Sequence, residues 1–171
     1  MSAQHDTYVI RAANKHDLAE IDQLLGRSYP ALLKQAYPPS TLVTAIPLIS
    51  RAQPHLIASG TYFVVLDGDQ IVGAGGWTRA APNAQGGTAA DVGHIRHVVT
   101  DHRRVRSGIG RHLMTHIFAS AEQEGIRTLE CFSTLMAEKF YASLGFKTIG
   151  PISVNLRQGV TFASIHMRRS L

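Results

Sequence analysis

The segment of this chain with the most evident chemistry is a short basic loop, residues 105–110, between a predicted strand and a predicted helix. It contains Gly108 and Gly110, and the arginines Arg106 and Arg111 lie within and just after it. The first turn of a helix carries free amide N–H groups and a partial positive charge. Glycines let a ligand approach those amides, and arginines add charge-assisted hydrogen bonds. This combination predicts a binding site for a phosphate group.

Two familiar phosphate-binding motifs do not fit this loop. A P-loop needs Gly-x-x-x-x-Gly-Lys-Ser/Thr, and the loop has no Lys-Ser/Thr pair. A dinucleotide-binding fingerprint needs a third glycine after Gly108 and Gly110, at the position where the chain has Leu113. A Gly-x-Gly pair alone is also compatible with a simple turn into a helix, so the loop has to be weighed together with the rest of the chain.

The positive charge of the chain is concentrated around this loop. The net charge is +5 and the pI is about 9.7. Residues 94–112 hold five arginines against one aspartate, so this segment alone carries +4. A local positive field indicates one anionic ligand, whereas a nucleic-acid surface would be broader and would interleave aromatic side chains with the arginines. We therefore expect no nucleic-acid partner.

Histidines and one cysteine are the other chemically active side chains. A histidine side chain ordinarily ionises near pH 6.5, which suits removal of a proton at neutral pH, so His94 is a candidate base and His97 is a second candidate for this role. Cys131 lies in an apolar stretch without a neighbouring base, so we expect a small buried side chain there. His112 and His116 are four residues apart on a predicted helix, but no third ligand is nearby in sequence, and we expect no metal site.

Length and composition indicate an ordinary globular chain. Its 171 residues are enough to bury a core, and a single cysteine excludes an intramolecular disulfide. No stretch reaches the roughly 18 apolar residues that span a bilayer. The polar start, Met1–Asp6, is not followed by the apolar region of a secretion signal. We expect a single domain, residues 1–171, in the cytoplasm and without a membrane partner.

The hydrophobic pattern predicts a sheet of about seven strands. Period-two and β-rich runs mark the strands, and Asp67-Gly68-Asp69 marks a hairpin turn. Gly75-Gly76 permits a bulge or a close backbone approach. Because hairpins exclude an all-parallel sheet, we expect an α+β fold, with a mixed, mostly antiparallel sheet and helices on both faces. The predicted strands are 8–11, 61–66, 70–74, 92–100, 128–132, 146–156 and 160–167.

Helices are predicted where apolar residues recur at helical spacing. The clearest begins at Ile109 and ends before Gly125, and a shorter one covers 137–144. In the N-terminal region, Asn14 or Asp17 is placed to cap a helix. We expect proline to divide the rest of that region. The expected breaks are Pro30 and Pro38-Pro39, which leave two further short helices around 32–33 and 42–49, the second interrupted at Pro47.

Two motifs together resemble the GCN5-related N-acetyltransferase (GNAT) family. Residues 105–110, Val-Arg-Ser-Gly-Ile-Gly, follow a strand, precede a helix and look like the family's acetyl-CoA motif, Arg/Gln-x-x-Gly-x-Gly/Ala. Residues 137–146, Ala-Glu-Lys-Phe-Tyr-Ala-Ser-Leu-Gly-Phe, look like its second motif, Ala-x-x-Phe-Tyr-x-x-x-Gly-Phe. The resemblance extends over residues 8–171 and is closest from 61 to 146. It implies the GNAT fold.

The resemblance also implies a reaction. Acetyl-CoA is the co-substrate, no metal takes part, and the acetyl group passes directly to a primary amine of a small molecule or peptide. Tyr141 matches the tyrosine that protonates the leaving thiolate, and a base must take a proton from the amine. His94 stands where the family often has a glutamate. A homodimer through the C-terminal strands is compatible with the family. The implied coenzyme A-binding residues are Val98 and Val99 for the pantetheine arm and Arg106, Ser107, Gly108, Ile109, Gly110 and Arg111 for the pyrophosphate.

The chain departs from the family's motifs at three positions. Val105 replaces Arg or Gln, Thr134 replaces a common Asn, and His94 replaces the glutamate. These departures leave three candidates for the base, namely His94, His97 and water. They also leave open a second function, a catalytically weak domain that binds acyl-CoA and regulates a partner, although the presence of Tyr141 argues against it. The residues do not identify the acceptor amine or the length of the acyl chain.

Overall fold

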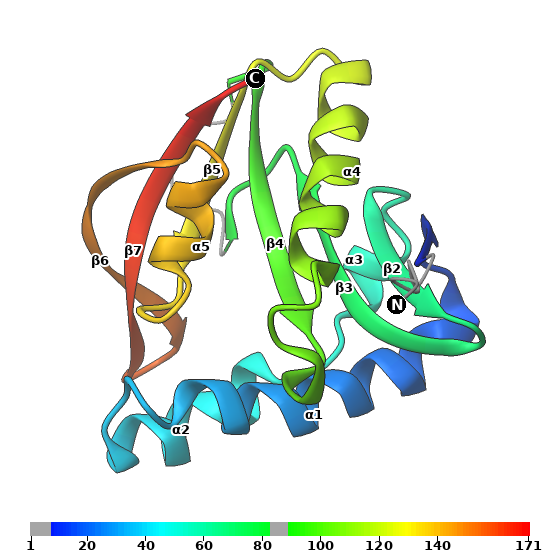
Figure 1. Ribbon diagram of the computed structural model, residues 1–171. Helices are drawn as coiled ribbons and strands as arrows, with labels where there is room; N and C mark the ends of the chain where they lie inside the picture. Colours follow the sequence, from blue (N-terminus) through cyan, green and yellow to red (C-terminus); the bar gives the residue numbers. More distant parts are fainter. Residues whose placement is uncertain (1–7, 83–88) are drawn as a thin grey trace, which may run out of the picture.

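A seven-stranded sheet forms the centre of the structure (Figure 1). The computed structural model describes residues 8–82 and 89–171. The strand order is β1-β2-β3-β4-β5-β7-β6, and neighbours are antiparallel except for β4 and β5, which are parallel. The expected α+β fold with a mixed, mostly antiparallel sheet is thereby confirmed. The strands are β1 (Val9–Ala12), β2 (Tyr62–Asp67), β3 (Gln70–Thr78), β4 (Val92–Thr100), β5 (Thr128–Ser133), β6 (Lys147–Arg157) and β7 (Val160–Ser170).

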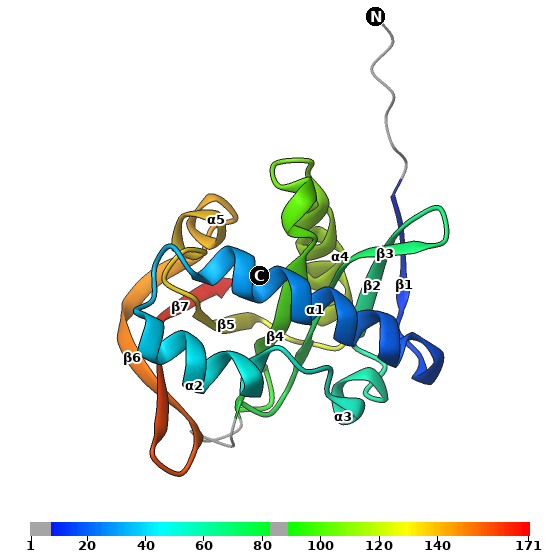
Figure 2. The same ribbon diagram turned by 90° about the horizontal axis from the view of Figure 1, so that it is seen from below.

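Helices cover both faces of this sheet (Figure 2). Strand β2 contributes to both apolar cores: Phe63 and Val65 point to one face, and Tyr62 and Val64 to the other, as the period of two requires. No helix of the described residues is long and apolar enough to cross a membrane. The face containing Tyr62 is covered by α1 (Leu18–Leu33), α2 (Pro39–Ile49) and α3 (Pro54–Ile57), and the other face by α4 (Ile109–Gln123) and α5 (Glu138–Ser143).

Helix α1 continues through Pro30, so the expected break there is wrong. Asn14 caps the short turn that precedes α1, and its side chain accepts a hydrogen bond from the N–H of His16. Proline removes one backbone hydrogen bond from a helix. Tyr29 and Leu33 on either side of Pro30 are buried in the core, and this burial offsets the lost bond. Residues 32–33 therefore end α1 and do not form a helix of their own.

The other prolines behave differently from one another. Pro39 is the first residue of α2, where proline is well tolerated, so the division between α1 and α2 is confirmed. Pro47 was expected to interrupt this helix, but α2 continues to Ile49, and the N–H of Ser50 still bonds to Ile46 O. Helix α3 was not predicted, because four residues are too few to show helical periodicity.

A bulge lies between β3 and β4, where the two glycines were expected to permit one. The register shifts between Ala74 and Gly76, so that His97 and Val98 of β4 face Gly75 alone. The extra residue is on β4, and His97 has a φ of +52°, which is unusual for a side chain other than glycine. Both glycines are required here, because a Cβ at Gly75 would lie 2.7 Å from the side chain of Val98 and one at Gly76 would overlap the backbone of β2.

Strands β4 and β5 separate soon after they begin. Their pairing covers only Val92–His94 opposite Thr128–Glu130. Beyond His94 the two strands diverge, and the edge of β4 that faces β5 has no strand beside it (Figure 1). Since a sheet normally pairs every backbone group inside it, this gap is the natural place for an extended ligand.

Candidate active site

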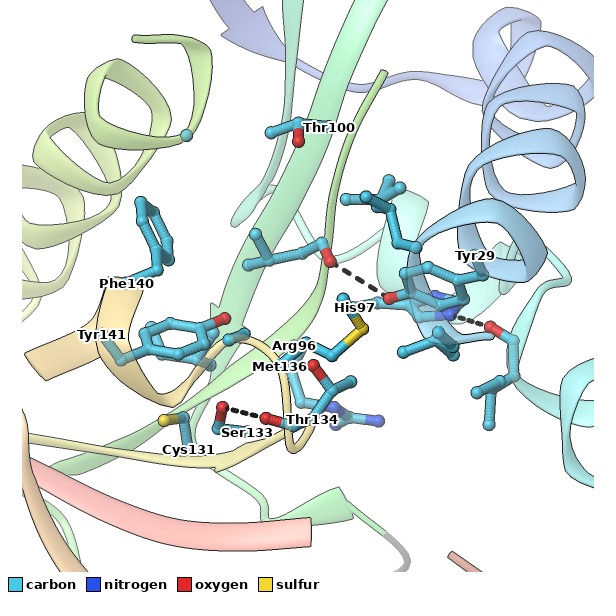
Figure 3. Close-up of a pocket in the computed structure, with 18 of the residues that line it drawn as sticks. Tyr29, Arg96, His97, Thr100, Cys131, Ser133, Thr134, Met136, Phe140 and Tyr141 are labelled. Carbon is cyan, nitrogen blue, oxygen red and sulfur yellow. Dashed lines mark hydrogen bonds between the residues drawn. The ribbon is translucent and has the colours of Figure 1, made fainter. Parts of the chain in front are cut away.

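A cleft of about 920 Å³ lies where β4 and β5 separate. Its volume is typical of sites that hold a small-molecule ligand. One wall is β4, and Figure 3 shows Tyr141 and Phe140 on the opposite side from Tyr29 and His97. The cleft therefore has two sides, one under α4 and α5 and the other under α1 and α2. Its lining segments are 95–100 of β4, 104–111 before and at the start of α4, 131–134 of β5, and parts of α1, α2, α5, β6 and β7.

The basic glycine loop lines one end of the cleft. Arg106 and Gly108 both have positive φ, at 63° and 83°, and Gly108 is the N-terminal cap of α4. The first amide of this helix to bond within it is that of His112, which donates to Gly108 O at 3.0 Å. The amides of the preceding helical residues, including Gly110 and Arg111, have no partner in the preceding turn of α4. The structure thus brings a row of free N–H groups to the cleft.

Gly110 is a glycine for a packing reason. A Cβ at this position would lie 2.9 Å from the ring of Phe140, which comes from α5. This contact brings the second motif against the first. The ring of Phe140 is in turn 5.3 Å from that of Tyr141, in an edge-to-face arrangement. The position of Tyr141 in the cleft therefore depends on the close approach of α4 and α5 at Gly110.

The charge at the loop is smaller than the sequence count indicates. Arg103 bonds to Asp101 at 2.8 Å, and Arg104 bonds to Asp67. The bond with Arg103 is the main reason that the pKa of the Asp101 carboxyl lies well below its usual value. Two of the five arginines in this segment are thus neutralised by carboxylates. Arg106 and Arg111 have no carboxylate partner among the described residues, and both line the cleft.

Tyr141 is buried from bulk solvent but faces the cleft. Tyr141 is 7% exposed, and it lines the cleft from α5 (Figure 3). Burial raises the pKa of its hydroxyl well above 10, so the hydroxyl keeps its proton. Among the described residues none forms a hydrogen bond with this hydroxyl, although Tyr29, Tyr37 and Tyr62 all donate theirs to backbone oxygens. A hydroxyl in this state is a proton donor without a fixed acceptor.

The two histidines considered as bases lie in different surroundings. His94 is 6% exposed and is not among the residues that line the cleft, and its Nδ1 lies 3.8 Å from Glu130 Oε2. His97 does line the cleft, and its Nε2 lies 2.5 Å from Ile49 O. A carbonyl oxygen only accepts, so Nε2 donates the proton and Nδ1 keeps a free lone pair. Burial lowers the pKa of both imidazoles below 6.5, and both are neutral at pH 7.

Val98 and Val99 line the cleft from the unpaired edge of β4, as does the buried Cys131 from β5. The carbonyl of Val98 accepts a hydrogen bond from the hydroxyl of Tyr29 at 3.1 Å, which fixes the strand just after the bulge.

Burial raises the pKa of the Cys131 thiol, so the nucleophilic thiolate is not formed at neutral pH. No group of three or more metal-ligating side chains is gathered in the described part of the chain.

Two residues of the cleft were not singled out from the sequence. Tyr29 was not considered, and Arg96 was counted only as a charge. Tyr29 lies 5.8 Å from the ring of His97, and Arg96 lines the cleft one residue before it. The signal for Arg96 was present, because strand alternation places it on the same face as His94. The bulge that turns His97 to this face as well has no counterpart in the hydrophobic pattern.

A family model described as "Acetyltransferase (GNAT) domain" matches residues 39–170. No curated protein sequence matches the chain. Among solved structures, a GCN5-related N-acetyltransferase from Rhodopseudomonas palustris superposes with a TM-score of 0.75 at 18% identity, over 96% of both chains. An N-acetyltransferase from Thermoplasma acidophilum, solved in complex with coenzyme A, gives 0.72 at 12% identity, over 96% of this chain and 99% of its own.

One further structural neighbour is a larger protein. N-acetylglutamate synthase from Neisseria gonorrhoeae, in complex with coenzyme A and N-acetyl-glutamate, has a TM-score of 0.64 at 18% identity. The match covers 96% of this chain and 35% of that one. At these identities the structural likeness establishes the fold, and the family match over most of the chain establishes the family.

Proposed function

The chain belongs to the acetyltransferase (GNAT) domain family, and from this we propose that it is a single-domain N-acetyltransferase that uses acetyl-CoA. The acceptor is a primary amine of a small molecule or a peptide. Bound acetyl-CoA supplies a thioester, whose carbonyl carbon the amine attacks directly, without an acyl-enzyme. The buried, protonated state of Cys131 agrees with a mechanism that needs no nucleophilic side chain.

The two ends of coenzyme A fit two different features of the cleft. The free amides of residues 106–111 suit a pyrophosphate, as do the guanidinium groups of Arg106 and Arg111, which have no carboxylate partner among the described residues. The unpaired edge of β4 at Val98 and Val99 suits the amide-bearing pantetheine arm, which would add to the sheet like a further strand. Coenzyme A complexes of structural neighbours support this assignment.

Tyr141 is proposed as the acid that protonates the leaving thiolate. It faces the cleft from α5, opposite the edge of β4 where the thioester would lie. Its raised pKa keeps the proton on the hydroxyl until negative charge develops on sulfur. The free hydroxyl of Tyr141, aimed at the gap between β4 and β5, is the single observation that carries the proposal of catalysis rather than binding alone.

His97 is proposed as the base that takes the proton of the amine, directly or through one water. It lines the cleft on the side opposite Tyr141, and its Nδ1 lone pair is free while Nε2 is held by Ile49 O. His94 was the first choice from the sequence. It becomes the second choice here, because it is buried beside Glu130 and does not line the cleft. Alanine variants of the two histidines, compared in the same assay, discriminate between them.

An assay of thiol release tests the function. Purified protein with acetyl-CoA and a panel of primary amines is expected to release free coenzyme A at a rate that depends on the amine. Acetylated product in the same reaction, measured by mass spectrometry, excludes simple thioester hydrolysis. Binding of acetyl-CoA without transfer to any amine would instead support the regulatory acyl-CoA-binding domain.

A further inference from the structure

The cleft carries positive charges at both ends and no described carboxylate lines it. Its charged lining residues are Arg104, Arg106 and Arg111 at the loop and Arg96 on β4, and Asp and Glu are absent from the described lining. The loop arginines suit the pyrophosphate. Arg96 has no role in that assignment, so its presence in the cleft needs a separate explanation.

Arg96 is a half-buried cation without a counter-ion. Its Nη1 donates to Thr78 Oγ1 at 3.0 Å, and that hydroxyl in turn donates to Ala80 O at 2.7 Å, which orients the guanidinium. No carboxylate of the described chain forms an ion pair with it. Burial lowers the pKa of Arg96, which expresses the free-energy cost of holding an unpaired charge there.

The remaining N–H groups of Arg96 are accessible from the cleft. A guanidinium has five N–H donors, and one is used by Thr78. Among the described side-chain nitrogens and oxygens, Arg27 Nε and His166 Nε2 are the atoms that are buried without a hydrogen-bond partner. The Arg96 nitrogens that do not bond to Thr78 are not in this group, so they are not fully buried. Arg96 therefore presents an open donor edge to a ligand, and its planar fork matches a carboxylate.

Arg96 lies at the acceptor end of the cleft, not at the pyrophosphate end. A Cβ on Gly110 of the loop would be 3.7 Å from Thr100, which places the loop beside the end of β4. Arg96 and Thr100 pair with Gly76 and Gly73, which are three residues apart on β3, so Arg96 lies about 10 Å from Thr100 along the sheet. It precedes His97 in β4, both residues line the cleft, and Figure 3 shows Arg96 between Tyr141 and the side that holds Tyr29 and His97. A ligand group bound by Arg96 would belong to the amine that His97 deprotonates.

The side chains that line the cleft near Arg96 indicate what the rest of the acceptor molecule is like. They are mainly apolar and come from α1, α2, α3, β6 and β7. No described acidic residue is present to bind a second ammonium group, so a polyamine would meet only the positive charges of Arg96 and the loop. The apolar lining residues on this side include Leu32, Leu33, Ile49, Leu56, Val154 and Phe162, and the uncharged polar ones include Gln53 and Ser164.

We propose that Arg96 binds a carboxylate of the acceptor, and that the acceptor is an amino acid or a similar amino-carboxylate with an apolar side chain. This inference rests on the proposed acetyl transfer. The carboxylate neutralises the buried guanidinium, the apolar side chain lies against α1, α2 and α3, and the amine is directed toward His97 and the thioester.

Matched acceptors with and without a carboxylate test the proposal. Leucine and phenylalanine are compared with 3-methylbutylamine and 2-phenylethylamine, which differ from them only by the loss of the carboxyl group. We expect kcat/KM to be about tenfold to a hundredfold higher for the amino acids, the range that a charged hydrogen-bonded pair supplies. Equal or better use of the two amines would overturn the proposal.

Variants of Arg96 identify the group responsible. In Arg96→Gln the ratio of kcat/KM between leucine and 3-methylbutylamine should fall to near one, and Arg96→Lys should retain part of it, since charge remains while the fork is lost. Arg127→Gln, which removes an exposed arginine outside the cleft, should keep the wild-type ratio. An unchanged ratio in Arg96→Gln would contradict the assignment to Arg96.

The same experiments separate this inference from the proposed function. Calorimetric titration with acetyl-CoA should give the same Kd for Arg96→Gln and the wild type, because Arg96 lies far from the pyrophosphate end. If the wild type binds acetyl-CoA and acetylates amines with no preference for a carboxylate, the acceptor assignment is wrong and the acetyltransferase function stands. If acetyl-CoA does not bind at all, the function itself fails.

Discussion

The burial of Tyr141 determines both where its hydroxyl points and how it ionises. Phe140 and Phe146 pack against its ring at 5.3 and 5.4 Å, and together they leave the hydroxyl directed into the cleft. Tyr141→Phe preserves this packing and removes only the proton donor. We expect kcat to fall by about a hundredfold or more, the range for a general acid, with little change in the Kd of acetyl-CoA.

For Tyr141→Phe, the rate of thiol release measures kcat, and calorimetry measures the Kd of acetyl-CoA. Tyr37→Phe is the matched control, because the Tyr37 hydroxyl bonds to Ala163 O and Leu135 N, so it has a structural role. That control should lower the free energy of unfolding by about 1–3 kcal/mol. Full activity in Tyr141→Phe would reduce Tyr141 to a packing role.

The ionisation of His97 predicts how activity depends on pH. A base must be neutral to act, and burial lowers the pKa of His97 below 6.5. The rate should therefore be at its maximum above pH 6.5 and should decline as the pH falls through the lowered pKa of His97. The pH profile of kcat measures this acidic limb. His97→Ala should remove it, whereas a limb that persists in His97→Ala and disappears in His94→Ala would assign the role to His94.

At the residue scale, the sequence could identify groups but not their surroundings. Tyr141 and the loop glycines follow from two motifs, and the structure places them in one cleft. His94 was preferred over His97 because it stands where the family often has a glutamate. Simple strand alternation would direct His97 to the other face, and the bulge reverses that direction. Gly75-Gly76 permitted a bulge, but nothing in the local sequence of β4 showed that His97 would take part in it.

At the scale of elements, the proposed function predicts that the contact between α4 and α5 couples coenzyme A binding to catalysis. Gly110 of α4 lies directly against the ring of Phe140 of α5, so a methyl group there must displace that ring. Gly110→Ala should weaken acetyl-CoA binding and also lower kcat, because Tyr141 follows Phe140. Gly110→Asp should abolish binding, since it adds a carboxylate facing the pyrophosphate.

A glycine in open space provides the control for Gly110. Gly26 lies in α1 with nothing within 4 Å of the position where a Cβ would be. Gly26→Ala should raise the free energy of unfolding by about 0.5–1 kcal/mol through helix propensity, without affecting acetyl-CoA. Thermal melting and calorimetry on the two alanine variants make the comparison. Equal acetyl-CoA affinity in both would contradict the role given to the Gly110–Phe140 contact.

Most strands and the helix α4 could be predicted, because their apolar residues repeat at the period of the element. The N-terminal helices could not be bounded in the same way. Pro30 and Pro47 look like breaks in the local sequence, and only the packing of Tyr29 and Leu33 on the sheet explains why α1 continues. Tertiary contacts here outweigh a local preference, whereas α3 was missed because it is too short to show a helical period.

At the scale of the whole molecule, ion pairs determine which of the positive charges remain for a ligand. Arg103 and Arg104 are neutralised by Asp101 and Asp67, while Arg106 and Arg111 are not. Arg106→Gln and Arg111→Gln should each raise the Kd of coenzyme A by about threefold to tenfold, and weaken its dependence on salt.

Arg127→Gln is the matched control for these two charge variants, since Arg127 is exposed and outside the cleft. It removes the same net charge, so it should leave both the affinity for coenzyme A and the salt dependence almost unchanged. Titrations at low and high salt compare the three proteins. A similar loss of affinity in all three would indicate a general effect of net charge and would contradict a local pyrophosphate site.

The central claim is that the cleft between β4 and β5 is an acetyl-CoA site, and calorimetric titration of the purified protein with acetyl-CoA and with free coenzyme A tests it most directly. We predict micromolar binding of both at one site per chain, and loss of both in Gly110→Asp. If neither ligand binds the wild-type protein, the loop, the free edge of β4 and Tyr141 do not form the site described, and the account is contradicted.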